Sequence, residues 1–461
     1  MTFTLRETTV SMTKKLLNVY NMSPRMAMLE VGTGGGKTYG AIHTAATIDP
    51  NLHLLLISTK AILNTKQWDI QIDDYNTVMN THLTFTAFNY DKLPLKAHYP
   101  NIVKAITDNY NQGKRSIIIL DEVHMVKLAS DAKSSKRANK LISLTRMPQV
   151  LTTLGLSATT VSNSLLDMST YLIIAGFYES TRDFISTHVK RYDEYHTPVI
   201  KDKSGEIRDD FFKNPEDIKN LYNMITVRVD TSMYMPEVIS TRLNFKLQPE
   251  QRKQYRKVIR DYDNGLYEFP VQVRSAQNKL LANQLFAQKD LALIGILEKR
   301  DAKEFDGIVT PILIFYEYTA TLDHIDRILK TLYPDDPIFY LSGSRKKPKN
   351  MGKPDNNRAI YLIQYAFGAE GLDWQWSNVS VFYEAAVRSI KYVQAQGRNV
   401  RNKSIMPRVY HYFFKFEGTI DAQRWLLLQQ KRNFTTRLSK EFLNIERATS
   451  DESENLNGYN Y

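Results

Sequence analysis

The sequence predicts an α/β fold with doubly wound parallel sheets, and three observations support this prediction. Short, almost wholly apolar runs at 52–58, 116–120 and 150–156 alternate with stretches of helical pattern. Strands buried in a parallel sheet have this composition because helices cover both faces of the sheet. A glycine-rich loop links a further apolar run to a helical stretch, and a second alternating region follows residue 290. Strands that alternate with helices in this way indicate βαβ units.

The glycine-rich loop has four glycines in five positions, followed directly by Lys-Thr. The apolar run 26–29 before it suits a buried strand, and residues 39–42 after it suit a helix. In a phosphate-binding loop, backbone N–H groups surround the β- and γ-phosphates of a nucleotide, and side chains at the glycines would block this approach. The sequence therefore predicts a nucleotide site at Gly32, Thr33, Gly34, Gly35, Gly36, Lys37 and Thr38.

Two residues of this loop carry side-chain chemistry. Lys37 would place a positive charge beside the β- and γ-phosphates, and the Thr38 hydroxyl would bind Mg²⁺. The strict pattern of such loops has Gly or Ala at the position of Val31, so this chain departs from the pattern there. The alternative interpretation is a glycine-rich turn with an incidental Lys-Thr.

The composition narrows the functional classes. The chain of 461 residues contains no cysteine, which excludes disulfides, thiolate zinc sites, iron–sulfur clusters and a cysteine nucleophile. Its nine histidines are scattered, so the sequence suggests no metal site built on histidine. The net charge of +12 favours a polyanionic partner. Because no apolar run reaches membrane-spanning length and the N-terminus lacks a basic segment followed by an apolar one, we expect a cytoplasmic protein without a membrane partner.

We expect four segments along the chain. Residues 1–165 would form the first α/β domain, and residues 166–290 would form a helical insertion and connector rich in Tyr, Lys and Arg. Residues 441–461 have the composition of a flexible acidic tail. Residues 291–440 would form the second α/β domain, because apolar strand patterns recur at 311–316, 338–341, 359–364 and 379–383.

Two acids, Asp121 and Glu122, follow the apolar run that ends at residue 120. In a nucleoside triphosphatase the first acid of such a pair holds Mg²⁺, directly or through water, and the second polarises the attacking water. The alternative is a pair of acids at the surface end of a strand. The upstream glycine loop favours the catalytic interpretation, because the two features belong to one kind of site.

Toward the other end of the chain, residues 394–401 read Gln-Ala-Gln-Gly-Arg-Asn-Val-Arg. If this stretch is helical, Gln394, Arg398 and Arg401 share one face. Arginine suits phosphate because its planar fork meets two oxygens and keeps its charge. The stretch therefore predicts either two arginines that reach a phosphate or a solvated basic helix.

Five motifs occur in the order of superfamily 2 helicase motifs I, II, III, V and VI, and the chain resembles that superfamily. They are residues 33–38, Asp121-Glu122-Val123-His124, Ser157-Ala158-Thr159, residues 368–373 and residues 394–401. The resemblance implies two RecA-like domains in tandem, with ATP and Mg²⁺ as cofactors. Finer features resemble the Swi/Snf-like, DEVH-box branch of double-strand translocases, and the compact chain resembles helicases of bacteriophages and mobile elements. These finer features are Trp68, residues 89–93, Asn163 with Leu166-Asp167, Met235-Pro236 followed by Gln251 and Tyr255, and residues 418–421 with Lys431.

The resemblance also implies roles for single residues. Arg398 and Arg401 would act as arginine fingers, and Gln394 would contact the nucleotide or couple the site to it. The family's adenine-reading glutamine is absent, since Thr8 and Thr9 stand in its place. Coupling between ATP, nucleic acid and domain movement would fall to His124, Ser157, Thr159, Gly371 and Asp373.

These inferences predict an ATP-dependent DNA helicase or double-strand DNA translocase in the replication, recombination or repair of a phage or mobile genome. Contacts with nucleic acid would be mainly to phosphates, and replication or recombination proteins would be further partners. Three alternatives stay open: an RNA helicase, a restriction translocase subunit, and a nucleic-acid-binding scaffold that uses ATP as a switch without productive turnover. The intact Glu122 and the paired arginines argue against the scaffold.

Overall fold

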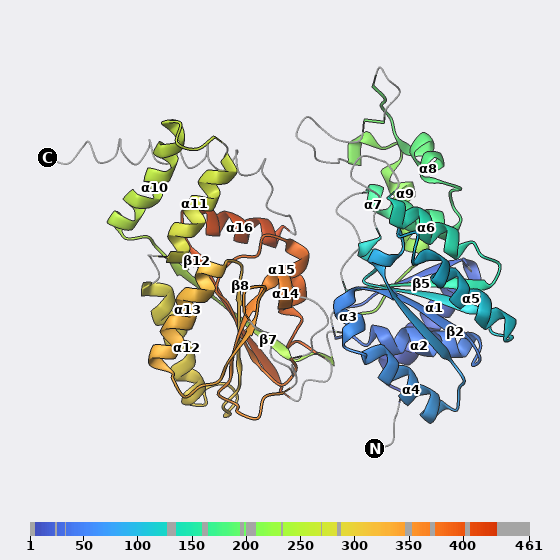
Figure 1. Cartoon of the computed structure of the whole chain (residues 1–461), viewed down its shortest axis with the longest axis horizontal. Coiled ribbons are helices and arrows are strands. Elements are labelled where there is room, and N and C mark those ends of the chain that lie inside the picture. Colours follow the sequence, from blue (N-terminus) through green and yellow to red (C-terminus); the bar gives the residue numbers. More distant parts are fainter. Residues whose placement is uncertain are drawn as a thin grey trace. The chain divides into compact units, whose positions relative to one another are not determined.

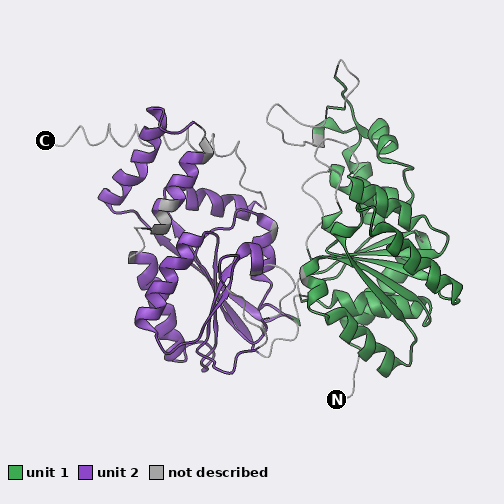
Figure 2. Ribbon diagram, viewed as in Figure 1, with its two compact units in different colours: residues 1–234 green, residues 235–461 purple. Residues whose placement is uncertain are grey.

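A computed structural model gives the structure of the chain (Figure 1) and describes residues 5–23, 25–32, 34–126, 135–158, 165–193, 198–199, 209–231, 234–268, 270–283, 287–345, 353–368, 374–401 and 406–430. The chain divides into two compact units, one up to residue 234 and one from residue 235 (Figure 2). The segment expected to form one helical connector, residues 166–290, is thus split between the two units. It also contributes a strand to the sheet of each unit, so it is not purely helical.

The first unit is built on a six-stranded sheet in which all neighbouring strands are parallel, in the order β3-β2-β4-β5-β1-β6. Every residue of β1, β2 and β4 is buried, as expected of strands that are covered on both faces. The four strands predicted in this half of the chain are all present. The strands are β1 Met26–Glu30, β2 His53–Ser58, β3 Thr84–Asn89, β4 Ser116–Asp121, β5 Val150–Ser157 and β6 Thr226–Arg228.

Helices pack around this sheet (Figure 1). The first two helices approach each other closely, because a Cβ at Gly40 would lie only 3.0 Å from the Met12 Sδ atom. The α-helices are α1 Glu7–Met22, α2 Lys37–Ile48, α3 Lys60–Asn64, α4 Gln67–Met79, α5 Tyr99–Asn111, α6 Lys136–Thr145, α7 Leu165–Ala175, α8 Thr181–His188 and α9 Pro215–Met224. Short 3₁₀ turns are η1 Tyr90–Lys92, η2 Val123–Met125 and η3 Asp209–Phe211.

The second unit contains another six-stranded parallel sheet, in the order β7-β12-β11-β8-β10-β9. Its strands are β7 Glu237–Phe245, β8 Ile312–Tyr316, β9 Ile338–Leu341, β10 Ile360–Gln364, β11 Val379–Phe382 and β12 Arg408–Phe416. Its helices are α10 Pro249–Asp263, α11 Pro270–Asn283, α12 Ala287–Asp301, α13 Thr319–Leu332, α14 Tyr365–Gly368, α15 Ser389–Gln396 and α16 Ile420–Gln429. Strands β8 to β11 were predicted, whereas β7 and β12 were not. Among the described helices of both units, none combines the length and the apolar character that a membrane span requires.

Alternate side chains of the second sheet belong to two separate hydrophobic layers. Ile312 and Ile314 of β8 lie in one buried cluster, and Leu313 and Phe315 lie in the other. Because successive side chains of a strand point to opposite faces, the two clusters cover the two faces of the sheet. Phe315 also stacks on Phe382 of β11, with ring centroids 5.1 Å apart. Two parallel sheets with flanking helices confirm the predicted α/β class and agree with RecA-like domains in tandem.

Candidate functional site

Three predicted motifs meet at the carboxyl edge of the first sheet. The glycine loop follows β1, Asp121 ends β4 and Ser157 ends β5. The strand registers bring these ends together, since Glu30 pairs with Ser157 and Asp121 pairs with Leu156. Doubly wound sheets bind their ligands at this edge. The fold therefore gathers residues that lie far apart in the sequence into one candidate site.

The glycine loop leads directly into the N-terminus of α2. Gly36 precedes the helix with a φ of 89°, in the left-handed region that favours glycine. Lys37 is the first helical residue, so the N–H groups of the first turn and the positive end of the helix dipole adjoin the loop. A Cβ on Gly32 or Gly36 would have no other atom within 4 Å. This open space suits phosphate groups, and Thr33 lies outside the described residues.

Val31, the departure from the usual loop pattern, is accommodated by packing against Gly35. The Val31 side chain is buried, and any Cβ on Gly35 would collide with its Cγ1 atom. The Val31 carbonyl also accepts a hydrogen bond of 3.1 Å from the Lys37 Nζ atom. A larger residue at position 31 therefore fits because position 35 carries no side chain.

Asp121 is buried and fixed by two aromatic side chains. The indole N–H of Trp68 donates to the Asp121 Oδ2 atom at 3.0 Å, and the Tyr90 hydroxyl donates to the Asp121 carbonyl at 3.0 Å. Burial and the neighbouring carboxylate of Glu122 raise the pKa of Asp121 to about 6. The carboxyl is therefore mainly ionised at neutral pH and held in one orientation. Sequence reasoning singled out Trp68 only through the family resemblance and did not foresee this contact.

Glu122 occupies a backbone conformation that costs free energy. Its φ of 57° lies in the left-handed region, where a residue with a side chain is uncommon. The Glu122 Oε2 atom lies 3.3 Å from the His124 Nδ1 atom. The next carbonyl, that of Val123, accepts a hydrogen bond of 3.1 Å from the Tyr171 hydroxyl. This conformation turns the chain sharply after β4 and sets the Glu122 carboxylate at the end of the strand.

Of the predicted coupling residues, the structure describes His124 and Ser157. Ser157 is buried, and its carbonyl accepts a hydrogen bond of 3.1 Å from the Val31 N–H group. The end of β5 is thereby tied to the start of the glycine loop. The other predicted coupling residues, Thr159, Gly371 and Asp373, lie outside the described residues.

Thr38 and Asp121 are the residues that could hold Mg²⁺. Within the described ranges, no group of three or more His, Cys, Asp or Glu side chains could hold a metal ion. Protein-bound Mg²⁺ usually keeps several waters and takes only one or two protein ligands together with substrate phosphates. A hydroxyl at the start of α2 and an ionised carboxylate at the end of β4 suit this mode of binding.

The predicted motif VI residues are not all on one helix. Helix α15 ends at Gln396, so Gln394 is helical whereas Arg398 and Arg401 follow the helix. The expectation that the three side chains share one helical face is therefore wrong. Arg398 is nevertheless buried, and its carbonyl accepts a hydrogen bond of 3.1 Å from the Trp374 N–H group.

Asn399 fixes the path of the chain after the helix ends at its C-cap, Gly397. Its Nδ2 atom donates to the Ser380 hydroxyl at 2.9 Å, and its Oδ1 atom lies 3.1 Å from the His411 Nε2 atom. Burial lowers the pKa of His411 to about 3, so the ring is neutral. Ser380 and His411 belong to β11 and β12, and these bonds fasten the segment between Arg398 and Arg401 to the second sheet.

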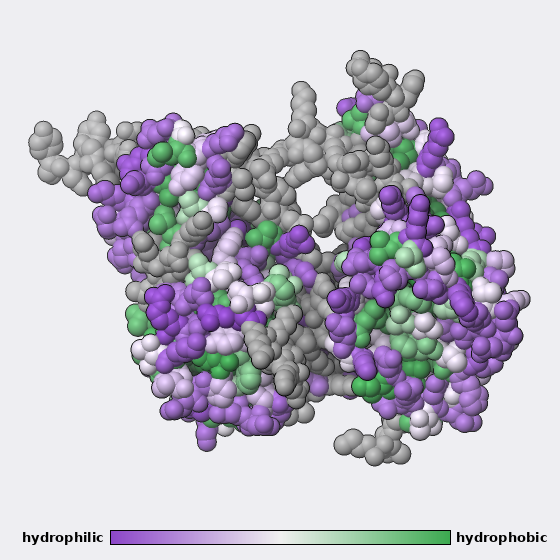
Figure 3. Space-filling model, in the orientation of Figure 1, coloured by the Kyte–Doolittle hydropathy of each residue, from purple (hydrophilic) through white to green (hydrophobic). Residues whose placement is uncertain are grey.

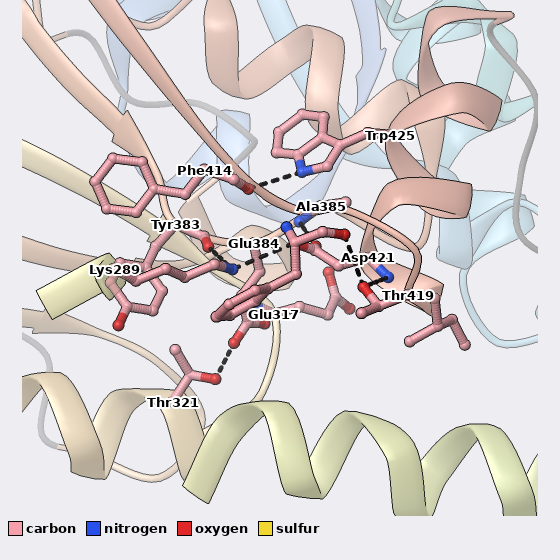
Figure 4. A network of polar contacts seen from close by, with 12 residues as sticks. Lys289, Glu317, Thr321, Tyr383, Glu384, Ala385, Phe414, Thr419, Asp421 and Trp425 are labelled. Atoms are coloured by element: carbon pink, nitrogen blue, oxygen red, sulfur yellow. Dashed lines mark hydrogen bonds and ion pairs between the residues drawn. The ribbon is translucent and has the colours of Figure 1, made fainter. Parts of the chain in front are cut away.

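A buried ion pair holds the loop that leads from β11 to α15 (Figure 4). The Lys289 Nζ atom donates to the Tyr383 carbonyl at 2.9 Å and to the Asp421 Oδ2 atom at 3.3 Å. Asp421 also accepts from the Ala385 N–H at 3.4 Å and from the Phe416 N–H at 3.0 Å. The sequence marked Asp421 only as part of a family motif and gave no signal for Lys289.

Two further carboxyl groups adjoin this ion pair (Figure 4). Glu384 accepts hydrogen bonds from the Thr321 hydroxyl and, at 3.2 Å, from the Glu317 N–H group. Glu317 in turn accepts from the Val387 N–H group at 3.3 Å. Burial raises the pKa of both carboxyls, that of Glu384 to about 8. Glu384 is therefore mainly protonated at neutral pH.

The pKa of Glu384 predicts how the stability of the second unit depends on pH. Between its ordinary pKa of 4.5 and the folded value of about 8, the unfolded chain releases the proton that the folded chain keeps. The free energy of unfolding should therefore fall as the pH rises through this window. Glu384→Gln imitates the protonated carboxyl, so between pH 6 and pH 8 its free energy of unfolding should fall by about 2 kcal/mol less than that of the parent chain.

Urea denaturation at pH 6 and pH 8 measures this difference. The matched control is Glu298→Gln, a change on the exposed face of α12, which should keep the pH dependence of the parent chain. Equal slopes for Glu384→Gln and the parent would contradict the prediction.

Two comparisons with known proteins bear on this site. Residues 2–162, which contain the glycine loop, the acid pair and Ser157, match the family described as "Type III restriction enzyme, res subunit". The chain is also 24% identical over 259 residues to a protein of Methanocaldococcus jannaschii with the name "Putative ATP-dependent RNA helicase MJ1505". That alignment covers 52% of this chain and 31% of the relative. Both similarities support the resemblance to superfamily 2 helicases that the motifs carry.

Proposed function

We propose that the protein is an ATP-dependent motor on nucleic acid, acting as a DNA helicase or a double-strand DNA translocase. The observation that carries this proposal is the carboxyl edge of the first sheet, where the glycine loop adjoins Asp121 and Glu122. A phosphate-binding loop beside a carboxylate pair is the arrangement that hydrolysis of a nucleoside triphosphate needs.

Each residue of this site has a proposed task. Lys37 neutralises charge on the β- and γ-phosphates, while Thr38 and Asp121 would hold Mg²⁺, which would neutralise further phosphate charge. Glu122 accepts a proton from the attacking water. The Trp68 hydrogen bond keeps the Asp121 carboxylate in one orientation. Lys37 is thus assigned to nucleotide binding and Glu122 to the chemical step, so variants of the two residues can test binding and hydrolysis separately.

We extend the proposal to Gln394, Arg398 and Arg401 of the second unit. They would stabilise the charge of the transferred phosphoryl group, as planar guanidinium groups do in phosphoryl transfer. The bonds of Asn399 to Ser380 and His411 support this assignment, because they hold the arginine-bearing segment without a helix. His124 and Ser157 are proposed to couple hydrolysis to movement.

Separate observations bear on the kind of nucleic acid. The Swi/Snf-like features favour duplex DNA, and we place the proposed activity in the genome maintenance of a phage or mobile element. The name of the archaeal relative favours the alternative of an RNA helicase. The name of the matching family favours a restriction translocase subunit. In each case the net charge of +12 supports contacts with phosphates that weaken as salt increases.

One experiment tests the proposal: ATP turnover is measured alone and with single-stranded DNA, duplex DNA, forked DNA and RNA. We expect duplex or forked DNA to increase the rate at least about tenfold, and the increase to shrink at higher salt. Stimulation by RNA alone would favour the RNA helicase. Rates that none of these polymers changes would reject the motor, and tight polymer binding without turnover would favour the scaffold.

A further inference from the structure

Glu30, the last residue of β1, is a buried carboxylate to which the proposed hydrolysis assigns no task. It is only 7% exposed and lies immediately before the glycine loop. The Tyr222 hydroxyl donates to its Oε1 atom at 2.6 Å, and the Arg228 Nε atom donates to its Oε2 atom at 2.7 Å. Both donors lie almost two hundred residues later in the chain, so no local pattern predicts the contact.

The donors of Glu30 hold one another in place. Arg228 donates a second hydrogen bond of 2.9 Å to the Asn223 Oδ1 atom, and its guanidinium carbon lies 6.0 Å from the centroid of the Tyr222 ring. A buried carboxylate is costly unless it is paired and hydrogen-bonded. In this junction of Glu30, Tyr222 and Arg228, each carboxylate oxygen accepts a short, directed hydrogen bond, and one of the two donors is charged. The geometry of the junction is therefore specific.

Arg228 lies on the segment by which the chain leaves the first unit. Strand β6 pairs in parallel with β1, so that Arg228 lies opposite Glu30. The segment then continues along the glycine loop, because the Thr231 side chain is buried and its Oγ1 atom lies 3.0 Å from the point where a Cβ of Gly35 would lie. The second unit begins at residue 235. The exit segment, residues 225–231, therefore touches both ends of the loop that is proposed to hold phosphate.

We propose that Glu30 is a positioning residue that joins the phosphate loop to the exit segment through Arg228 and Tyr222. A rearrangement of the loop when a nucleotide binds is thereby passed to the stretch of chain that leads into the second unit. The inference rests on the proposed ATP-dependent motor and names the connection by which nucleotide state reaches the second unit. Glu30 is engaged by Tyr222 and Arg228 and is assigned no contact with the nucleotide, so loss of these contacts should impair coupling rather than binding.

The test uses the full chain with Glu30→Gln, Arg228→Gln, Arg228→Lys and the double change Glu30→Gln/Arg228→Gln. Three quantities are measured: the dissociation constant of ATP, the ATP turnover without polymer, and the turnover with saturating DNA. For both single Gln variants we expect the stimulation by DNA to fall about tenfold. The dissociation constant and the unstimulated turnover should stay within about threefold of the parent values. Arg228→Lys should restore part of the stimulation, and the double variant should be no worse than either single variant.

A matched control tests whether the loss of any ion pair in this unit would have the same effect. Lys104→Gln removes an exposed pair with Asp108 on α5 of the same unit and should leave all three quantities unchanged. If Glu30→Gln does not fold, Arg228→Gln still decides the matter, because the Arg228 side chain is half-exposed.

The failure of this inference differs from the failure of the proposed function. A parent chain without polymer-stimulated turnover would overturn the proposed motor and this inference with it. A stimulated parent with fully stimulated Glu30 and Arg228 variants would overturn the inference alone. The inference would also be overturned if the variants lost nucleotide binding and both rates in parallel, or if the two single effects added in the double variant, because either result indicates a purely structural role.

Discussion

Glu122→Gln is expected to lower polymer-stimulated ATP turnover by at least about a hundredfold while ATP binding is retained. The amide has the shape of the carboxylate but cannot take a proton from water. The change should also leave the fold intact, because Gln tolerates the left-handed backbone at this position as well as Glu does, and Tyr171 still holds the neighbouring carbonyl. The time course of phosphate release measures the turnover, and equilibrium binding of a fluorescent ATP analogue measures whether nucleotide binding is retained.

Lys37→Ala provides the contrasting variant for the same measurements. Its ammonium group is assigned to the phosphates themselves, so its loss should weaken nucleotide binding and abolish turnover together. Turnover of Glu122→Gln within tenfold of the parent would remove Glu122 from the proposed chemistry. Normal nucleotide binding by Lys37→Ala would remove the glycine loop from the proposed site.

The sequence predicted all inner strands of the first sheet, and in the second sheet it predicted β8, β10, β11 and the edge strand β9 but missed the inner strand β12. Strands β1, β2 and β4 have apolar interiors and are buried at every position, so composition alone predicts them. The missed strand β7 alternates between exposed and partly buried residues over most of its length. Its polar side chains resemble a helical connector until the partner β12 is known, since pairing along all nine residues fixes it as a strand. Strand β7 is thus defined by its partner more than by its own composition.

The same distinction applies to the candidate site. The glycine loop and the acid pair are contiguous in sequence, and their chemistry can be predicted from residue type and order. The helix considered for Arg398 and Arg401 ends before them at the Gly397 C-cap, and Asn399 then bonds with Ser380 and His411, tertiary contacts that the local pattern does not show. Glu30 shows the limit most clearly, since both of its partners are distant in sequence. Sequence thus predicts the groups that carry chemistry better than the groups that hold them.

Asp421→Asn should be among the most destabilising single changes in the second unit, with a loss of about 3–5 kcal/mol in the free energy of unfolding. The amide keeps the size of the side chain, yet it leaves the buried ammonium of Lys289 without its charged partner. Urea denaturation at constant pH measures the loss. The matched control is Asp323→Asn, which breaks an exposed pair with Arg345 in the same unit and should cost less than about 1 kcal/mol.

The double change Lys289→Met/Asp421→Asn tests whether the unpaired charge is the cause. The double change removes the Lys289 ammonium group together with the Asp421 carboxylate, so the double variant should be more stable than Asp421→Asn alone. A double variant that loses the sum of both single effects would contradict this explanation. The charge of Lys289 also acts on Glu384, whose pKa it lowers while Asp421 raises it. In Asp421→Asn the pKa of Glu384 should therefore fall, because the charge that raised it is gone while the attraction to Lys289 remains.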